Sequence, residues 1–195
     1  MYAVWYALPG VSQAKKLLPV LLLLLLAIPD SSFGFDGKRK GMIVGLGIGA
    51  APIAHWSVTP SGPDFDEIGL AGNGLIGYAW DNQNAVVYEG NGCIYKSSQL
   101  GDAWVLQGLD AIRWYHYWGN RDRQAFTCVG IGLWVFDGQY SNINGNGFGY
   151  SAGIGYEISK KVQVGCYYNG GRTSNDYNLK TTQSVLTLLI TVVAY

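Results

Sequence analysis

Charged residues are scarce in this sequence, and neither sign prevails. Lys and Arg number 13, Asp and Glu number 13, and together they make up 13% of the 195 residues. A chain without a basic excess has no broad electrostatic surface for nucleic acid. A water-soluble domain with so little charge and 14% aromatic residues would also be poorly solvated. The composition therefore argues against nucleic acid as a partner and against an ordinary soluble domain.

Long apolar runs and paired cysteines are absent as well. Beyond residue 34 no segment approaches the roughly 18 apolar residues that a membrane-spanning helix needs, so that part of the chain is not a helical membrane protein. Cys93, Cys128 and Cys166 are odd in number and widely spaced, which fits neither a disulfide framework nor a metal site. The acidic residues Asp64, Asp66 and Glu67 are expected to lie in a solvated loop rather than at an ion site. We therefore expect no metal.

A glycine pattern near residue 45 also fails to indicate a cofactor. Gly45-Leu-Gly-Ile-Gly-Ala50 has the spacing of a dinucleotide-binding fingerprint. That fingerprint needs the N-terminus of a helix directly behind it to hold the pyrophosphate. Here Ala51-Pro52-Ile53 follows instead, and similar Gly-x-Gly units recur along the chain. We therefore expect no cofactor of any kind.

The N-terminus has the three parts of a secretory signal. Lys15 and Lys16 precede an apolar stretch, residues 17–28, and a small-x-small ending follows at Ser32-Phe33-Gly34. The stretch is shorter than the roughly 20 residues that span a bilayer as a helix, although a retained anchor is the alternative. We predict that residues 1–34 are an N-terminal extension and cleavable signal peptide, and that residues 35–195 are the mature domain.

The remaining sequence alternates with a period of two. From Gly41 to Ala50 every even position is apolar and most odd positions are glycine, and the same alternation returns from Gly147 to Ile158. A period of two indicates β-strands. In a soluble sheet the face away from the core would carry Lys, Glu and Thr, whereas here one face is apolar and the other is small or weakly polar. This pattern is typical of transmembrane barrels, with the apolar face toward lipid.

Eight such segments follow one another. We predict strands at Gly41–Ser57, Glu67–Trp80, Asn84–Lys96, Ala103–Tyr117, Gln124–Asp137, Gly147–Ile158, Lys161–Arg172 and Thr181–Tyr195. Longer connections, such as Val58–Asp66, alternate with tighter turns, such as Ser159–Lys160. This alternation is expected of an even-stranded barrel with both termini in the periplasm. Because lipid cannot satisfy a free sheet edge, the sheet must close. The predicted fold class is all-β: a closed antiparallel up-and-down transmembrane β-barrel of about eight strands.

Aromatic residues gather at the predicted strand ends, where the two membrane interfaces would lie. The turn-side set is Tyr78, Trp80, Tyr117, Trp118, Tyr156 and Tyr195, and the loop-side set is Trp56, Trp104, Phe136, Phe148 and Tyr168. We predict that these rings form two girdles around the barrel.

Three stretches resemble the small bacterial outer-membrane β-barrel superfamily that includes the OmpA transmembrane domain, OmpX and the opacity proteins. They are Cys128–Leu133, the segment from Gly149 to Tyr168 with its tight polar turn, and the aromatic C-terminus at Tyr195. The resemblance implies a location in the outer membrane of a Gram-negative bacterium and contact with outer-membrane lipid and lipopolysaccharide. It also implies insertion by the barrel-assembly machinery, with Tyr195 as assembly signal. We expect a monomer.

The charged residues within the predicted strands include Glu89, Arg113, Glu157 and Lys161. On the lipid face an Arg or Lys at the midplane would cost about 2–4 kcal/mol. We therefore predict that these residues form a charge network inside an eight-stranded lumen, which side chains just fill. A pore or gate is the alternative. Asp110 falls on the strand face opposite to Arg113, so it is the alternative lumen residue of that strand.

No catalytic group is apparent. His55 and His116 lie on different strands, and the sequence offers no third partner for either. Lipid A deacylases resemble this strand layout, but the late segment Tyr167–Asn175 contains a Ser and no His. The predicted function is a non-enzymatic barrel with a side-chain-filled lumen and surface loops for envelope or adhesion-type contacts. The alternatives are a narrow channel for small solutes and a lipid A-modifying hydrolase.

Overall fold

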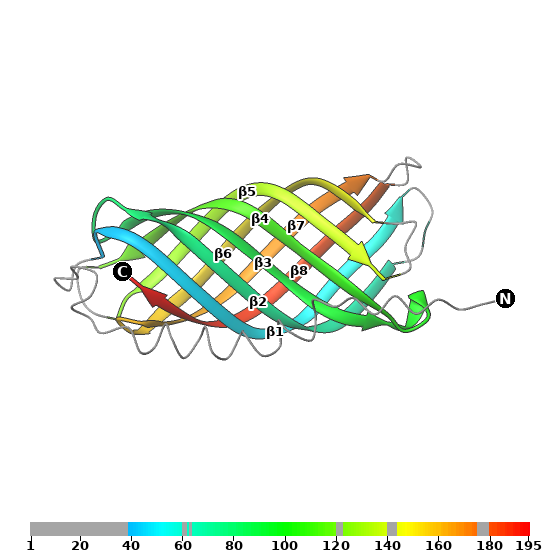
Figure 1. Ribbon diagram of the computed structural model, residues 1–195, viewed down its shortest axis with the longest axis horizontal. Helices are drawn as coiled ribbons and strands as arrows, with labels where there is room; N and C mark the ends of the chain where they lie inside the picture. The colour runs from blue at the N-terminus through cyan, green and yellow to red at the C-terminus, as the bar shows by residue number, and fades with distance from the viewer. Residues whose placement is uncertain (1–38, 60–61, 63, 120–122, 140–143, 175–179) are drawn as a thin grey trace.

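The strands of this chain close into one barrel (Figure 1). The structure is a computed structural model, and it describes residues 39–195 except 60–61, 63, 120–122, 140–143 and 175–179. The predicted signal segment, residues 1–34, lies outside the described residues. The strands are β1 (Gly41–Thr59), β2 (Asp64–Ala79), β3 (Asn84–Ser97), β4 (Ala103–Trp118), β5 (Ala125–Gly138), β6 (Gly145–Ser159), β7 (Val162–Ser174) and β8 (Lys180–Ala194).

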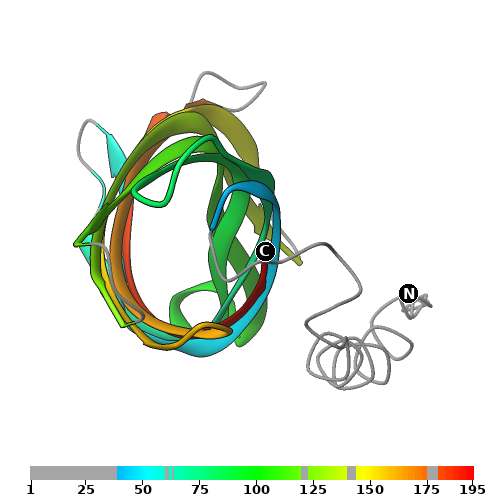
Figure 2. The same cartoon turned by 90° about the vertical axis from the view of Figure 1, so that its left-hand side faces the viewer.

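Each strand is antiparallel to its neighbours, and β1 pairs with both β2 and β8. Viewed from one end the strands form a closed ring (Figure 2). We call the end with the β2–β3, β4–β5 and β6–β7 connections and the C-terminus the turn end, and the other the loop end. In the part of the chain that the structure describes, no helix is long and apolar enough to cross a membrane.

The predicted strands are confirmed, and each boundary lies within three residues of its predicted place. The main difference is at the loop end of β1 and β2. The sequence predicted an irregular loop over Val58–Asp66, but the strands continue to Thr59 and resume at Asp64, so the connection is only residues 60–63. Asp64 and Asp66 face outward, whereas Glu67 lies on the inner face. The three acids therefore do not converge.

The two faces of the wall have the predicted character. Large apolar side chains such as Ile112, Ile131 and Ile154 are exposed on the outside. Inside, glycines make room for bulky side chains: Trp134 is fully buried, and a Cβ at Gly171 would lie 2.5 Å from its ring. The barrel therefore presents an apolar belt outward and a packed interior inward, which is the arrangement that a lipid environment requires.

A β-bulge in β1 overturns one part of the predicted pattern. The register with β2 shifts between Ala51 and Ala54, and the register with β8 shifts between Ala50 and Ile53. Pro52 lies in this irregular stretch, a usual place for proline in a strand. The bulge exchanges the two faces of the strand beyond it. Trp56 therefore points into the barrel and contacts Phe136, and its predicted place in the outer girdle was wrong.

The girdles are accordingly smaller than predicted. Four of the expected rings face the interior: Trp56, Tyr117, Phe136 and Tyr195. The outward-facing rings are Tyr78, Trp80, Trp118 and Tyr156 toward the turn end and Trp104, Phe148 and Tyr168 toward the loop end. The amphipathic rings outside still mark both interfaces.

Candidate functional site

The polar side chains of the lumen form the largest candidate site, and its centre is an ion pair. Glu89 on β3 and Arg113 on β4 are fully buried, and Nη1 of Arg113 lies 3.3 Å from Oε1 of Glu89. Nη2 of Arg113 donates across the lumen to Asn169 Oδ1 on β7, at 2.8 Å. The structure thus brings together two of the four predicted lumen charges and ties them to the opposite wall.

Hydrogen bonds surround the Glu89 carboxylate. Oε1 accepts from the Asn73 amide at 2.8 Å and from the Asn91 amide at 3.3 Å, and Oε2 accepts from the Tyr115 hydroxyl at 2.5 Å. Asn169 Nδ2 donates to Asn91 at 3.1 Å. A carboxylate with several donors and an arginine beside it meets the condition for burying a charge. The cluster spans the lumen and leaves no side of Glu89 unpaired.

The structure also decides which residue of β4 faces inward. Arg113 points into the lumen, and Asp110 is exposed on the outer wall, so the alternative that placed Asp110 inside was wrong. Asp110 leans over Gly90, where a Cβ would lie 2.8 Å from its carboxylate oxygen. The neighbouring strand has no side chain at this point, so the Asp110 carboxylate lies beside its backbone.

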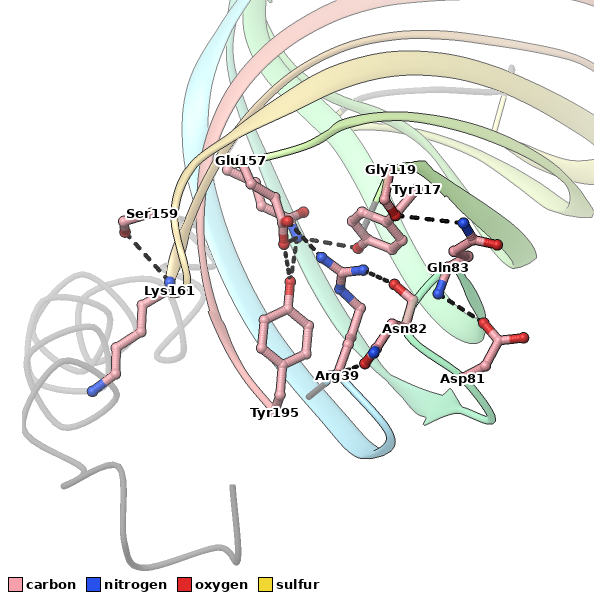
Figure 3. A network of polar contacts seen from close by, with 11 residues as sticks. Arg39, Asp81, Asn82, Gln83, Tyr117, Gly119, Glu157, Ser159, Lys161 and Tyr195 are labelled. Atoms are coloured by element: carbon pink, nitrogen blue, oxygen red, sulfur yellow. Dashed lines mark hydrogen bonds and ion pairs between the residues drawn. The ribbon is translucent and has the colours of Figure 1, made fainter. Parts of the chain in front are cut away.

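A second cluster closes the turn end (Figure 3). Arg39, which precedes β1, reaches into the barrel, and its Nη2 lies 2.5 Å from Oε2 of Glu157 on β6. The guanidinium carbon lies 3.4 Å from the ring centroid of Tyr117 and 5.3 Å from that of Tyr195. Arg39 also donates from its backbone to Asn82 Oδ1, at 3.0 Å, and from Nη1 to the Asn82 carbonyl. The partner of Glu157 is thus a residue that the sequence analysis missed.

Lys161 does not belong to either cluster, contrary to the prediction. It lies in the turn between β6 and β7, and its side chain extends away from the barrel interior (Figure 3). Its backbone N–H donates to the Ser159 hydroxyl at 3.4 Å. The register with β7 shifts between Glu157 and Ser159, so the alternation that keeps Glu157 inside does not extend to Lys161.

Tyr195 faces the lumen rather than the lipid. Its hydroxyl donates to Glu157 Oε1 at 2.5 Å and accepts from Gln163 Nε2 at 2.7 Å. This position explains why Tyr195 shares a strand face with Thr187 and Thr191. That Tyr195 is an assembly signal stays a prediction.

The loop end of the lumen is filled by amides and aromatic rings. Gln107 donates to the His55 carbonyl at 3.0 Å and accepts from the Tyr95 hydroxyl at 2.7 Å. Trp134 donates to Gln183, which in turn donates to Thr173. No ion pair lies in this part of the described lumen. The charged clusters are confined to the centre and the turn end.

The β2–β3 turn, which contains Asn82, is stabilised by Asp81. Its carboxylate accepts from the backbone N–H groups of Gln83, at 2.7 Å, and Asn84, at 2.6 Å, and from the Asn84 amide. Hydrogen bonds from the Asn84 side chain, followed by those from the backbone, lower the pKa of Asp81.

Among the described residues, no group of three or more His, Cys, Asp or Glu is arranged to hold a metal ion.

Comparison with known proteins gives the fold and no closer relation. No family model matches the sequence, and no curated protein matches it. Among solved structures, Neisserial surface protein A (NspA) superposes with a TM-score of 0.51 at 14% identity, covering 78% of this chain and 97% of that one. The protein has the fold of the small eight-stranded outer-membrane β-barrels. Its outer wall carries a belt of exposed apolar side chains, as the wall of a transmembrane barrel does.

Two further solved structures have lower TM-scores. The attachment invasion locus protein Ail of Yersinia pestis has a TM-score of 0.49 at 13% identity, covering 78% of this chain and 99% of its own. The N-terminal barrel domain of Pseudomonas aeruginosa OprF has a TM-score of 0.44 at 10% identity, covering 80% and 98%.

Proposed function

We propose that this outer-membrane barrel is a closed, monomeric element of the envelope that conducts no solutes. Its lumen serves stability, and its outer wall and short loops contact lipid and lipopolysaccharide. The observation that carries this proposal is the central cluster. Arg113 is bonded to Glu89 on the neighbouring strand and to Asn169 on the opposite wall. A solute crossing the lumen would have to break both contacts, and breaking a buried pair is costly.

Two further contacts support a closed lumen. Arg39 and Glu157 occupy the turn end, stacked on Tyr117. Trp134 fills the loop end and is fully buried. An eight-stranded barrel has an interior just wide enough for its side chains, whereas water-filled porins have about 16 strands.

The short connections at the loop end favour an envelope role over one that depends on extended loops. The β1–β2 connection is residues 60–63, and the β7–β8 connection is residues 175–179. Neither connection is long enough to form an extended loop.

Planar-bilayer conductance of the refolded protein tests the proposal. We expect no steady ohmic current from the wild type. Arg39→Ala removes the turn-end contact and keeps the central cluster, so it is expected to remain closed as well. A large ohmic conductance in the wild type would overturn the closed lumen and favour a narrow channel for small solutes.

A further inference from the structure

Three polar side chains from different strands lie in one row on the outer wall, near the loop end. The register places His55 of β1 opposite Asp66 of β2 on one side and opposite Ser184 of β8 on the other. Their strand neighbours Trp56 and Gln183 are buried in the lumen. Because side chains alternate along a strand, His55, Asp66 and Ser184 face outward.

The β1 bulge creates this row. If the register that holds before the bulge continued, His55 would lie opposite Phe65 of β2 and Gln183 of β8. The register shift in β1 moves His55 by one position, so that it lies opposite Asp66 and Ser184. The same shift turns His55 from the inner face to the outer face. A bulge that aims a side chain in this way is a recurrent device beside active sites.

The contact between His55 and Asp66 sets the state of the imidazole. Nδ1 of His55 lies 2.9 Å from Oδ1 of Asp66. An ionised carboxylate only accepts hydrogen bonds, so the proton of the neutral ring is on Nδ1. Nε2 then carries the lone pair and is the atom able to accept a proton. This is the tautomer that a carboxylate imposes on the general base of a serine hydrolase.

Ser184 lies beside His55 on the neighbouring strand, in the place of a nucleophile next to its general base. Residues directly opposite each other on antiparallel strands have Cβ atoms about 4.5–5.5 Å apart, a separation that rotation of the serine and imidazole side chains can close to a hydrogen bond. In free enzymes these hydrogen bonds are often long and tighten only with substrate. We propose that Ser184, His55 and Asp66 form a Ser–His–Asp esterase site on the outer wall, which cleaves acyl esters of membrane amphiphiles.

The depth of the row identifies the substrate class. On its membrane side the next outward residues are apolar, with Ile53 on β1, Ile68 on β2 and Leu186 on β8. On its loop side they are polar, with Ser57 and Thr182. The row thus lies where lipid changes to water, and a lipid ester with its acyl chain in the membrane and its alcohol part outside fits this boundary.

The outer wall on the membrane side of the row is apolar. Leu188 and Ile190 of β8 are exposed there, and a groove of about 770 Å³ begins at Leu188 and extends toward the turn end, where Trp118 and Tyr156 line it. Leu188 lies four residues from Ser184, a distance of about 13 Å along a strand that rises about 3.3 Å per residue. We assign the acyl chain of the ester to the apolar wall between Ser184 and this groove.

The reaction follows from these groups. Oγ of Ser184 attacks the ester carbonyl carbon while Nε2 of His55 takes its proton, which gives a tetrahedral oxyanion. The intermediate collapses, the bond to the alcohol oxygen breaks, and His55 returns the proton to the leaving alcohol. Water, deprotonated by His55, then attacks the acyl-serine and releases the carboxylic acid. Asp66 stabilises the imidazolium in both steps.

Tyr150 is positioned to stabilise the oxyanion. Gly170 lies opposite Ser184 on the side away from His55, and a Cβ at Gly170 would lie 2.9 Å from Cζ and from Oη of Tyr150. The phenol therefore covers the glycine beside the nucleophile, and its hydroxyl, which hydrogen-bonds to Tyr168 in the free protein, can turn to the oxyanion when substrate is bound. A single such donor is typically worth a factor of about 100 or more in catalytic rate.

Two measurements on the refolded, full-length barrel in detergent micelles test the site. A fluorophosphonate probe should attach to the wild type, and peptide mass spectrometry should find the adduct on Ser184. The wild type should also hydrolyse p-nitrophenyl decanoate in preference to p-nitrophenyl acetate, since only the longer chain can lie along the apolar wall on the membrane side of Ser184. Ser184→Ala should abolish both signals. His55→Gln and Asp66→Asn should reduce hydrolysis by about 100-fold or more.

Ser57→Ala is the matched control, because it removes a neighbouring hydroxyl from the same outer face, and it should leave both signals unchanged. Tyr150→Phe should lower kcat by about 100-fold with little change in KM; an unchanged kcat would overturn its assignment. The heat-dependent gel shift of a folded barrel verifies each variant. Folded wild type without adduct or hydrolysis, or hydrolysis that persists in Ser184→Ala, would overturn the site. This inference goes beyond the closed-lumen proposal, and bilayer conductance does not bear on it.

Discussion

The two arginine–carboxylate pairs inside the barrel differ in how they are supported. Glu89 and Arg113 come from adjacent strands, are fully buried, and exchange hydrogen bonds with amides from β2, β3 and β7. Arg39 and Glu157 come from the chain before β1 and from β6, and their side chains keep a small exposure of 8% and 4%. They are supported by the rings of Tyr117 and Tyr195 as well as by the amides of Asn82 and Gln163.

The difference indicates that the pairs have different tasks. In the centre, charge is neutralised by a rigid set of amides that fixes the strands relative to one another. At the turn end, Arg39, which precedes the first strand, closes the opening by stacking on aromatic rings. Water is closer to the second pair, which weakens its electrostatic energy and reduces the cost of breaking it.

The largest expected effect is at the centre. Arg113→Ala should lower the free energy of unfolding by about 3–5 kcal/mol, because it leaves the Glu89 carboxylate buried without its counter-charge. The double variant Glu89→Ala, Arg113→Ala should cost less than the sum of the single changes. Urea unfolding monitored by the gel shift of the folded barrel measures all three. Strictly additive costs would remove the pair from this description.

Arg172→Ala is the control for that experiment. Arg172 lies in β7 but is exposed on the outer face. Its removal should change the free energy of unfolding by no more than about 0.5 kcal/mol. A large loss in this control would mean that arginine content, and not the buried pair, determines stability.

At the turn end a smaller effect is expected. Arg39→Ala removes a charged hydrogen bond to Glu157, and the loss should be about 1.5–3 kcal/mol. It stays below the loss at the centre because Glu157 keeps its hydrogen bond from Tyr195 and is nearer to water. Lys40→Ala, at the exposed neighbouring position, is the matched control in the same unfolding assay. A loss equal to that of Arg113→Ala would erase the contrast between the two pairs.

Within the turn-end cluster, Tyr195→Phe should be milder still. It removes the hydroxyl bonded to Glu157 and Gln163 and keeps the ring near Arg39, so the expected loss is about 0.5–1.5 kcal/mol. If Tyr195 is also the assembly signal, Tyr195→Phe should insert normally while Tyr195→Ser accumulates outside the outer membrane. Fractionation of cells expressing each variant separates the two roles.

The smallest effect concerns the turn that carries Asn82. The pKa of Asp81 is lowered in the folded state by hydrogen bonds from the Asn84 side chain and then from the backbone. Its contribution to stability is therefore present above the pKa of the unfolded chain, about 4, and is lost as the pH falls through the folded value. Unfolding midpoints of wild type and Asp81→Asn should converge on acidification below about pH 4. A constant difference across that range would contradict the assignment.

The sequence was sufficient for the regular parts of the wall and for the central pair. Alternation over Gly147–Ile158 predicts a strand with glycine inside, and Glu89 and Arg113 occupy lumen positions of consecutive strands. The orientation of such residues follows from local periodicity and from the energetic cost of placing a charge in lipid. Whether Arg113 or Asp110 points into the lumen depends on which face of β4 is the inner one, and the register with β3 and β5 decides this.

The missed features all depend on breaks in periodicity. Arg39 precedes the first strand, so no alternation shows that its side chain enters the barrel. The sequence offered no partner for His55. The bulge at Ala51–Ala54 moves His55 opposite Asp66 and Ser184, and Ser184 is far away in sequence. A proline within an alternating strand, here Pro52, is the signal that could have indicated a bulge. It does not indicate which residues the shifted register brings together.

The lumen network has a consequence for the order of assembly. Several of its hydrogen bonds join β8 to strands near the start of the chain: Thr191 to Asn73 at 3.2 Å, Thr187 to Asn91 at 3.1 Å, and the Ser184 carbonyl to Gln107 at 3.4 Å. None of these bonds forms until β8 has reached β1, which is the pairing most distant in sequence and slowest to close. Until then the amides on the inner face lack these partners. Pairing of β8 with β1 therefore satisfies these amides together. We expect the last hairpin to dock in one cooperative kinetic step rather than residue by residue.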